Sequence, residues 1–228
     1  EKSYTYKELN HRINKLANGL LNLGIGKGSK VGILMFNSTV FFESFYAAAK
    51  IGAVMVPINF RLIPKELEYI INNSEMEALV YSEDFQQTID GIRSNTKNVK
   101  HYIYVNEDTP KGAISYTGIL DRQSDAEPSI SWEVGQNDMV MIMYTSGTTG
   151  TPKGVMFTHS ELLWSAASQA INYGFTKSDV TLLTGPLYHV GALVDLSIGT
   201  TNMGGTNVIM PSKDLDVSKL LDTIQREH

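Results

Sequence analysis

The amino-acid sequence predicts an α/β fold in which parallel sheets carry helices on both faces. Two runs, residues 30–36 (KVGILMF) and 53–59 (AVMVPIN), are almost entirely apolar, and segments with helical spacing of apolar residues alternate with such runs. Strands that are apolar on both sides are buried on both sides, which is typical of parallel sheets with crossover helices. The 228 residues, 42% of them hydrophobic, are enough for one large or two modest domains.

Capping signals mark the first two helices. Thr5 and Glu8 have the spacing of a capping box, which predicts a helix that begins there and ends at Gly24. Asn37 or Ser38 is expected to cap a second helix, because short polar side chains accept hydrogen bonds from the first free backbone N–H groups.

The remaining elements continue this alternation. We expect, in chain order, a helix over 64–73, a strand over 78–84, a weaker helix near 85–93, strands over 101–107 and 139–144, a short run over 154–158, a helix over 160–173, a strand over 180–185, a helix near 191–203, a strand over 207–211 and a helix over 216–227. Residues 109–136 are rich in Gly, Asp, Ser and Pro. We interpret them as a connection, with at most one short helix, between α/β segments 1–108 and 137–228.

Composition narrows the classes of protein. The chain has no cysteine, which excludes disulfides, thiolate nucleophiles and cysteine zinc sites and fits a cytoplasmic location. The net charge of -5 gives no bulk attraction to nucleic acid or anionic membranes, so neither is expected as a partner. The most apolar window, residues 40–58, contains Glu43, Lys50 and Pro57 and predicts a buried helix and strand rather than a transmembrane segment.

A polar loop, TSGTTGTPKG at residues 145–154, follows the strand expected over 139–144. Loops after buried parallel strands emerge at the carboxyl edge of the sheet, where α/β folds bind ligands. Its glycines let backbone N–H groups approach an anion. Its hydroxyl groups can donate to phosphate oxygens, and Lys153 adds one flexible cation. The sequence therefore predicts a polyphosphate site.

The spacing of this loop differs from that of a Walker P-loop. In a Walker loop a Ser or Thr follows the lysine and a helix begins there, whereas Gly154 follows Lys153 and residues 155–158 (VMFT) favour a strand. The loop thus offers no hydroxyl in the Walker magnesium position. The alternative interpretation, a hairpin turn without a ligand, explains the glycines and threonines but not Lys153.

Residues 144–159, YTSGTTGTPKGVMFTH, resemble the signature loop of the adenylate-forming enzymes. These are the acyl- and aryl-CoA synthetases, the firefly-type luciferases and the adenylation domains of peptide synthetases. Residues 3–38 and 47–80 resemble the early part of their large N-terminal domain. PLYHVGAL, residues 186–193, resembles the acyl-CoA synthetase form of a later motif. The resemblance covers essentially the whole chain.

This resemblance implies an incomplete large, AMP-binding domain (1–228) of an ATP-dependent acid–thiol ligase. Such an enzyme joins a carboxylate to the α-phosphate of ATP and then transfers the acyl group to coenzyme A. The residues implied to hold the β- and γ-phosphates are Thr145, Ser146, Gly147, Thr148, Thr149, Gly150 and Lys153. ATP, Mg²⁺ and coenzyme A are the implied cofactors and co-substrates, and a homodimer is conceivable for the full-length enzyme.

His189 and Gly191 belong to the PLYHVGAL motif, which by resemblance lines the acyl pocket. The resemblance leaves open whether His189 supplies a hydrogen bond or a wall. The small and apolar neighbours of His189 favour a fatty acyl or aryl acid as the substrate. An amino-acid substrate would need an acidic side chain of the protein to pair with its ammonium group. Asp195 is a candidate acid, on a helix that could direct it elsewhere. His11 and His159 have no such motif and are expected to be surface or packing residues.

Both ends of the sequence suggest a piece of a longer protein. The first helix cap lies within a few residues of the start, and the last helix has no stop signal. The family's later motifs, with its magnesium-binding glutamate, ribose-binding aspartate and C-terminal domain, are not in this sequence, so we expect the chain alone to be inactive. Two alternatives stay open: a peptide-synthetase adenylation domain serving a carrier protein, and a non-catalytic nucleotide-binding domain.

Overall fold

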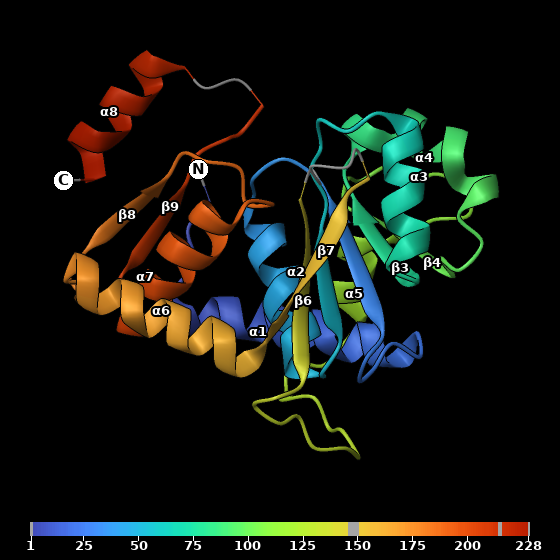
Figure 1. The fold of residues 1–228 in the computed structure, drawn as a ribbon, viewed down its shortest axis with the longest axis horizontal. Coiled ribbons are helices and arrows are strands. Elements are labelled where there is room, and N and C mark those ends of the chain that lie inside the picture. Colours follow the sequence, from blue (N-terminus) through green and yellow to red (C-terminus); the bar gives the residue numbers. More distant parts are fainter. Residues whose placement is uncertain (1, 146–150, 214–215, 228) are drawn as a thin grey trace.

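A seven-stranded sheet forms the centre of the protein in a computed structural model that describes residues 2–145, 151–213 and 216–227 (Figure 1). Its strands are β1 (Lys30–Leu34), β2 (Val54–Pro57), β3 (Met76–Tyr81), β4 (His101–Tyr104), β5 (Ile114–Ser115), β6 (Met139–Thr145) and β7 (Lys153–Thr158). Their order across the sheet is β5-β4-β3-β1-β2-β6-β7. All neighbours are parallel except β6 and β7, which are antiparallel.

Helices cover both faces of this sheet, as the sequence predicts. One face packs against α1 (Tyr6–Asn22), α2 (Thr39–Lys50) and α5 (Tyr116–Arg122), and the other against α3 (Pro64–Asn73) and α4 (Gln86–Ile92), with short 3-10 turns at Glu83–Phe85 and Arg93–Asn95. Alternate residues of β1 divide between the two cores: Val31 and Ile33 face the first, and Leu34 faces the second. This division explains why the strands are apolar at nearly every position.

A smaller sheet lies beside the large one, on the left in Figure 1. It consists of the parallel strands β8 (Val180–Leu183) and β9 (Thr206–Ile209). The helices of this part are α6 (His159–Tyr173), the π-helix η3 (Gly191–Ile198), α7 (Gly199–Met203) and α8 (Val217–Glu227). The boundary between the two sheets thus falls after β7, whereas residues 109–136 contribute β5 and α5 to the large sheet.

Several local expectations are confirmed or corrected. The Thr5–Glu8 capping box is present, but neither expected cap of α2 makes a side-chain capping bond, because Ser38 occupies the N-cap without one and the Asn37 side chain bonds elsewhere. The expectation of parallel strands fails at β7. The seven residues between β6 and β7 are too few for a crossover connection, which needs about a dozen or more, so β7 must return as a hairpin. The helix expected near 191–203 is divided into η3 and α7.

None of the helices in the described part of the chain combines the length and the apolar character needed to cross a bilayer.

Candidate functional site

The last residue of β6, Thr145, and the first of β7, Lys153, are the two ends of the polar loop, at the carboxyl edge of the large sheet (Figure 1). Thr145 and Lys153 are directly opposite each other in the strand register. Ser146, Gly147, Thr148, Thr149 and Gly150 lie outside the described residues. Of the predicted phosphate-binding residues, the structure therefore brings together Thr145 and Lys153 at the base of the loop.

Gly154 is required in the stem of this hairpin. It pairs with Tyr144, and a Cβ atom added to it would lie 2.8 Å from Cγ2 of Ile142 and 3.3 Å from Cζ of Tyr144. A larger residue would push these side chains away. The sequence signal GVMFT after the lysine thus reflects close packing across the hairpin as well as the start of a strand.

Helix α3 anchors both arms of the stem. The Tyr144 hydroxyl donates to Oδ1 of Asn73 at 2.6 Å, and the Tyr69 hydroxyl donates to the carbonyl of Pro152 at 3.4 Å. Burial, with a contribution from Tyr69, raises the pKa of Tyr144, so its hydroxyl remains a donor. The sequence analysis did not identify Tyr69 or Asn73, because the helical pattern of α3 gives no sign of what its polar face contacts.

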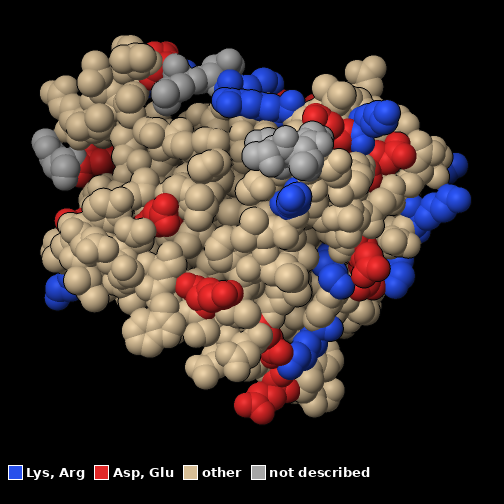
Figure 2. Space-filling model, in the orientation of Figure 1, with Lys and Arg blue, Asp and Glu red and all other residues tan. Residues whose placement is uncertain are grey.

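Lys153 is exposed at the base of the loop. Within the described ranges, no carboxylate lies within ion-pair distance of its ammonium group. Basic side chains lie along the upper edge of the molecule in Figure 2, the edge at which β6 ends in Figure 1. The geometry therefore leaves a cation available for an anion at this edge.

His189 follows β8 and lines a hollow in the surface. Its Nδ1 accepts a hydrogen bond from the Gly191 N–H at 3.3 Å. In the neutral ring this leaves the proton on Nε2. The hollow has a volume of about 400 Å³ and is lined by Tyr173, Thr184, Gly185, Pro186, His189, Gly191, Ala192, Asp195 and Leu196. The structure thus places both predicted acid-binding residues, His189 and Gly191, in one cavity.

Asp195 also lines this hollow. It belongs to the π-helix η3; π-helical segments are rare in proteins as a whole but are often found at functional sites. The sequence analysis allowed that the helix could direct this carboxylate elsewhere. A carboxylate side chain therefore lines the same hollow as His189. The sequence favoured a fatty acyl or aryl acid because no acidic residue stands next to His189, and Asp195 weakens that reason.

Asn37, one of the two residues considered as a cap for α2, instead contacts the loop that carries His189. Its side chain donates to the carbonyl of Gly185 at 2.8 Å and accepts from the Leu187 N–H at 2.8 Å. These contacts attach the loop that carries His189 to the carboxyl end of β1. The signal available in the sequence, a polar residue directly after a buried strand, is the same for a cap and for such a contact.

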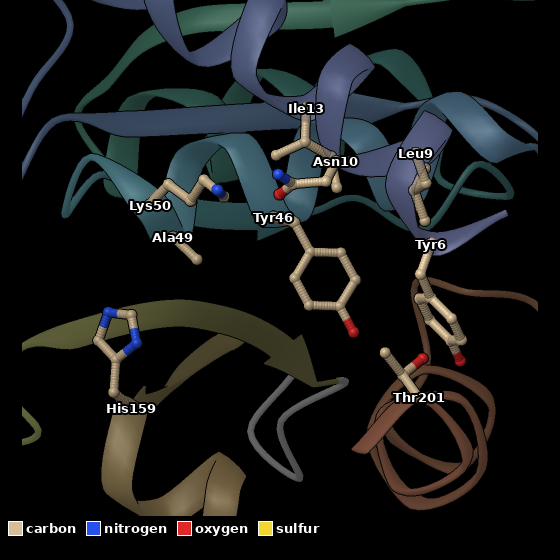
Figure 3. Close-up of a pocket in the computed structure, with 9 residues that line it drawn as sticks. All are labelled: Tyr6, Leu9, Asn10, Ile13, Tyr46, Ala49, Lys50, His159 and Thr201. Carbon is tan, nitrogen blue, oxygen red and sulfur yellow. The ribbon is translucent and has the colours of Figure 1, made fainter. Parts of the chain in front are cut away.

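A further cavity, about 380 Å³ in volume, separates α1 and α2 from α6 and α7 (Figure 3). It is lined mainly by apolar groups, and its Lys50 ammonium is paired with Glu127 at 2.5 Å. His159 lies on its wall with Nε2 buried, and burial lowers the pKa of this imidazole. His11 is on the surface, 2.7 Å from Asp125. This cavity shares no lining residue with the His189 hollow and is not part of the candidate site.

Across the part of the chain that is described, no group of three or more His, Cys, Asp or Glu side chains could hold a metal ion. Mg²⁺ is usually held by one or two carboxylates together with substrate phosphates and water, so any Mg²⁺ bound with a nucleotide would not need such a cluster.

A mostly parallel sheet with a Gly/Thr/Lys loop at its carboxyl edge is the arrangement of a nucleotide-binding α/β protein. All of residues 1–228 match the family described as AMP-binding enzyme, and the chain belongs to that family.

Relatives and solved structures agree with this assignment. Long-chain-fatty-acid–CoA ligase FadD13 of Mycobacterium tuberculosis is 38% identical over 98% of this chain and 42% of its own. A feruloyl-CoA synthase of Amycolatopsis sp is 32% identical over 98% of this chain and 42% of its own. The crystal structure of the anthranilate CoA ligase AuaEII with anthranoyl-AMP superimposes with a TM-score of 0.92 at 28% identity, over 99% of this chain and 43% of that one. The chain spans about two fifths of the length of these proteins.

Proposed function

We propose that the protein to which this chain belongs is an AMP-forming acid–CoA ligase. The observation that carries the proposal is the pairing of Thr145 with Lys153 at the tip of a hairpin, in a chain whose full length matches the AMP-binding enzymes. In this proposal the loop from Thr145 to Lys153 holds the β- and γ-phosphates of ATP, with Mg²⁺ held mainly by residues outside the described set.

The proposed reaction has two steps. A carboxylate oxygen of the acid attacks the α-phosphorus of ATP, the bond from that phosphorus to the bridging oxygen breaks, and pyrophosphate leaves. The sulfur of coenzyme A then attacks the acyl carbon, its proton is lost, and AMP leaves. Lys153 and the loop N–H groups would stabilise charge on the departing pyrophosphate, which is the step where fixed donors lower a barrier most.

A fatty acyl acid is the substrate that we favour. Two relatives that are 33% and 38% identical to this chain over 98% of its length are named for long-chain fatty acids, and the His189 hollow includes small and apolar residues such as Ala192 and Leu196. Other relatives are named for feruloyl-CoA, indoleacetate and crotonobetaine/carnitine. Because the first two of these contain aromatic rings, the proposal also includes an aryl acid as substrate. We also propose that the full-length enzyme is soluble, cytoplasmic and homodimeric.

Asp195 supports one second candidate, an adenylation domain that activates an amino acid for a carrier protein. Its carboxylate lines the same hollow as His189 and could pair with an ammonium group. The relatives favour the first candidate, because those we compared are CoA ligases.

The decisive assay is acid-dependent exchange of pyrophosphate into ATP by the full-length protein, followed by thioester formation with coenzyme A. The panel comprises fatty acids of increasing length, aryl acids and amino acids. Exchange with fatty or aryl acids and thioester formation would support the ligase. Exchange with amino acids alone, or with no acid, would contradict it.

Lys153→Ala tests the phosphate role directly. We expect kcat/KM for ATP in the exchange reaction to fall by about a hundredfold or more, because one preorganised charge on the leaving group is lost. Lys111→Ala is the matched control, since Lys111 is also an exposed loop lysine. Equal values for the two variants would rule out the assigned role.

A further inference from the structure

The Asn37 side chain links the end of β1 to the ends of both strands of the small sheet. Its Nδ2 group donates to the carbonyls of Gly185, at 2.8 Å, and Met210, at 3.2 Å. Its Oδ1 accepts from the Leu187 N–H at 2.8 Å. Its own backbone N–H donates to Oγ of Ser212 at 3.0 Å. The donor and the acceptor group of the Asn37 amide are therefore both hydrogen-bonded. Their partners lie about 150 residues or more away from Asn37 in the sequence.

Aromatic rings hold the same loop from the neighbouring strand. Tyr188 packs edge-on against Phe60, which follows β2, with ring centroids 5.0 Å apart, and Phe60 packs against Phe36 at 4.7 Å. Ring contacts of this kind tolerate small displacements. The directional hydrogen bonds of Asn37 therefore define where the loop lies along the sheet edge.

Asn37 and Thr145 follow or end two strands of the same sheet, β1 and β6. Strand β2 lies between β1, which ends beside Asn37, and β6, which leads into the loop at Thr145. His189 lies only two residues beyond Leu187, whose N–H is bonded to Asn37. The Asn37 side chain is therefore a hydrogen-bonded link between this sheet and the loop that carries His189.

From this geometry we infer that Asn37 is a positioning residue for acid activation, which sets the separation between the acid-binding loop at His189 and the phosphate-binding loop at Lys153. The inference rests on the proposed function. Attack of the carboxylate on the α-phosphorus requires both substrates in contact geometry, and a displacement of about 1 Å can lower the rate about a hundredfold. A helix cap, the role for which the sequence offered Asn37 or Ser38, would affect stability and not this separation.

The test compares Asn37→Ala with Asn207→Ala in the full-length protein. Asn207 is a matched control, because its Nδ2 also links segments of the small-sheet part, donating to Ser197 O at 3.2 Å and Thr201 Oγ1 at 2.9 Å, and both of these acceptors lie outside residues 184–191. For Asn37→Ala we expect kcat of acid-dependent pyrophosphate release to fall by about ten- to a hundredfold, with KM for ATP and acid changed by less than about threefold. Asn207→Ala should keep kcat within about threefold.

Asn37→Asp sharpens the test. It keeps the acceptor for the Leu187 N–H but places a carboxylate against the carbonyl oxygens of Gly185 and Met210. We expect kcat to fall at least as far as in Asn37→Ala, because like partial charges would repel the loop.

Amide hydrogen exchange gives a readout that needs no catalysis. Residues 184–191 should exchange faster in Asn37→Ala than in Asn207→Ala, since the Leu187 N–H loses its acceptor. Equal kcat in the two alanine variants, or unchanged exchange, overturns the inference. If exchange responds but no acid supports turnover even in the unmodified protein, the proposed function fails while the structural link remains.

Discussion

At the scale of the residue, the most consequential group outside the site is Glu43 of α2. Its carboxylate is fully buried and accepts from Arg12 at 2.9 Å and 3.1 Å and from the Tyr116 hydroxyl. Burial, followed by the charge of Glu43, raises the pKa of Tyr116 well above its usual value. The phenol therefore stays protonated and keeps donating to the carboxylate.

Glu43→Ala should destabilise the fold by about 3–5 kcal/mol, because it leaves the Arg12 guanidinium and the Tyr116 hydroxyl without their partner. Urea unfolding measures the loss. Glu77→Ala is the control: its salt bridge with Lys100, 2.9 Å long, has a well-exposed lysine and should contribute about 1 kcal/mol or less. A similar loss in both variants would contradict the central role of Glu43.

At the scale of the element, a row of asparagines on α1 holds the irregular segment that follows α5. Asn10, Asn14, Asn18 and Asn22 recur at intervals of four and so lie on one helix face. Their amides donate to Glu127 Oε1, to the carbonyls of Ser124, Asp125 and Ala126, and to Gln123 Oε1. Residues 123–127 thus have a defined course although they form neither helix nor strand.

Glu127 gives this attachment a pH dependence. The Lys50 ammonium, with Asn10 and Asn14, lowers the pKa of Glu127 from 4.5 to about 2. A carboxylate whose pKa is lower in the folded state stabilises the fold above its unfolded pKa, and this stabilisation is lost as the pH falls from about 4.5 to about 2. The side chain is 66% exposed, so solvent screening makes the effect modest.

We therefore expect Glu127→Gln to flatten the pH dependence of the unfolding free energy between about pH 4.5 and pH 2, relative to the unmodified chain. Urea titrations at several pH values provide the measurement. Glu133→Gln, on the same segment and exposed, should leave the slope unchanged. A slope that stays the same in Glu127→Gln would show that the contact with Lys50 contributes nothing in solution.

The elements also show how far the sequence could predict this fold. Periodicity and caps identified six of the seven strands of the large sheet and most of their covering helices, because burial on both faces leaves a direct apolar pattern. The two-residue edge strand β5 (Ile114–Ser115) was missed, because it is too short to show such a pattern. The antiparallel direction of β7 was missed, because the residues of a strand do not indicate which strand it pairs with or in which direction. The Asn37 contacts and the row on α1 were missed for a related reason: a polar side chain does not reveal which distant carbonyl it will meet.

The candidate site was predictable to a similar degree. The stem residues Thr145 and Lys153 and the pair His189 and Gly191 were named because their motifs resemble those of the adenylate-forming enzymes, and their binding roles stay predictions. Tyr69 and Asn73 were not named, because they act through the packing of α3 against the hairpin. Asp195 was named, but its direction depended on the π-helical geometry of η3, which periodicity does not reveal.

At the scale of the whole molecule, one surface is unusually apolar. Along α6 and β7, Met156, Leu163, Trp164 and Ile171 are 63%, 59%, 73% and 80% exposed. The area over α6 carries few charged side chains in Figure 2. Scattered apolar residues are common on surfaces, but several large apolar side chains this exposed on one helix and the strand before it favour association with other protein.

The 228-residue chain should therefore self-associate through α6. Trp164→Lys combined with Ile171→Lys should lower the weight-average mass at high protein concentration, because it places charges in the contact, and should change the unfolding free energy by only about 0.5 kcal/mol. Sedimentation equilibrium and urea unfolding measure the two quantities. Asn172→Lys, an exposed polar position on the same helix, controls for added charge. An unmodified chain that stays monomeric throughout, or a double variant that associates as strongly as this control, would exclude the α6 surface as the contact.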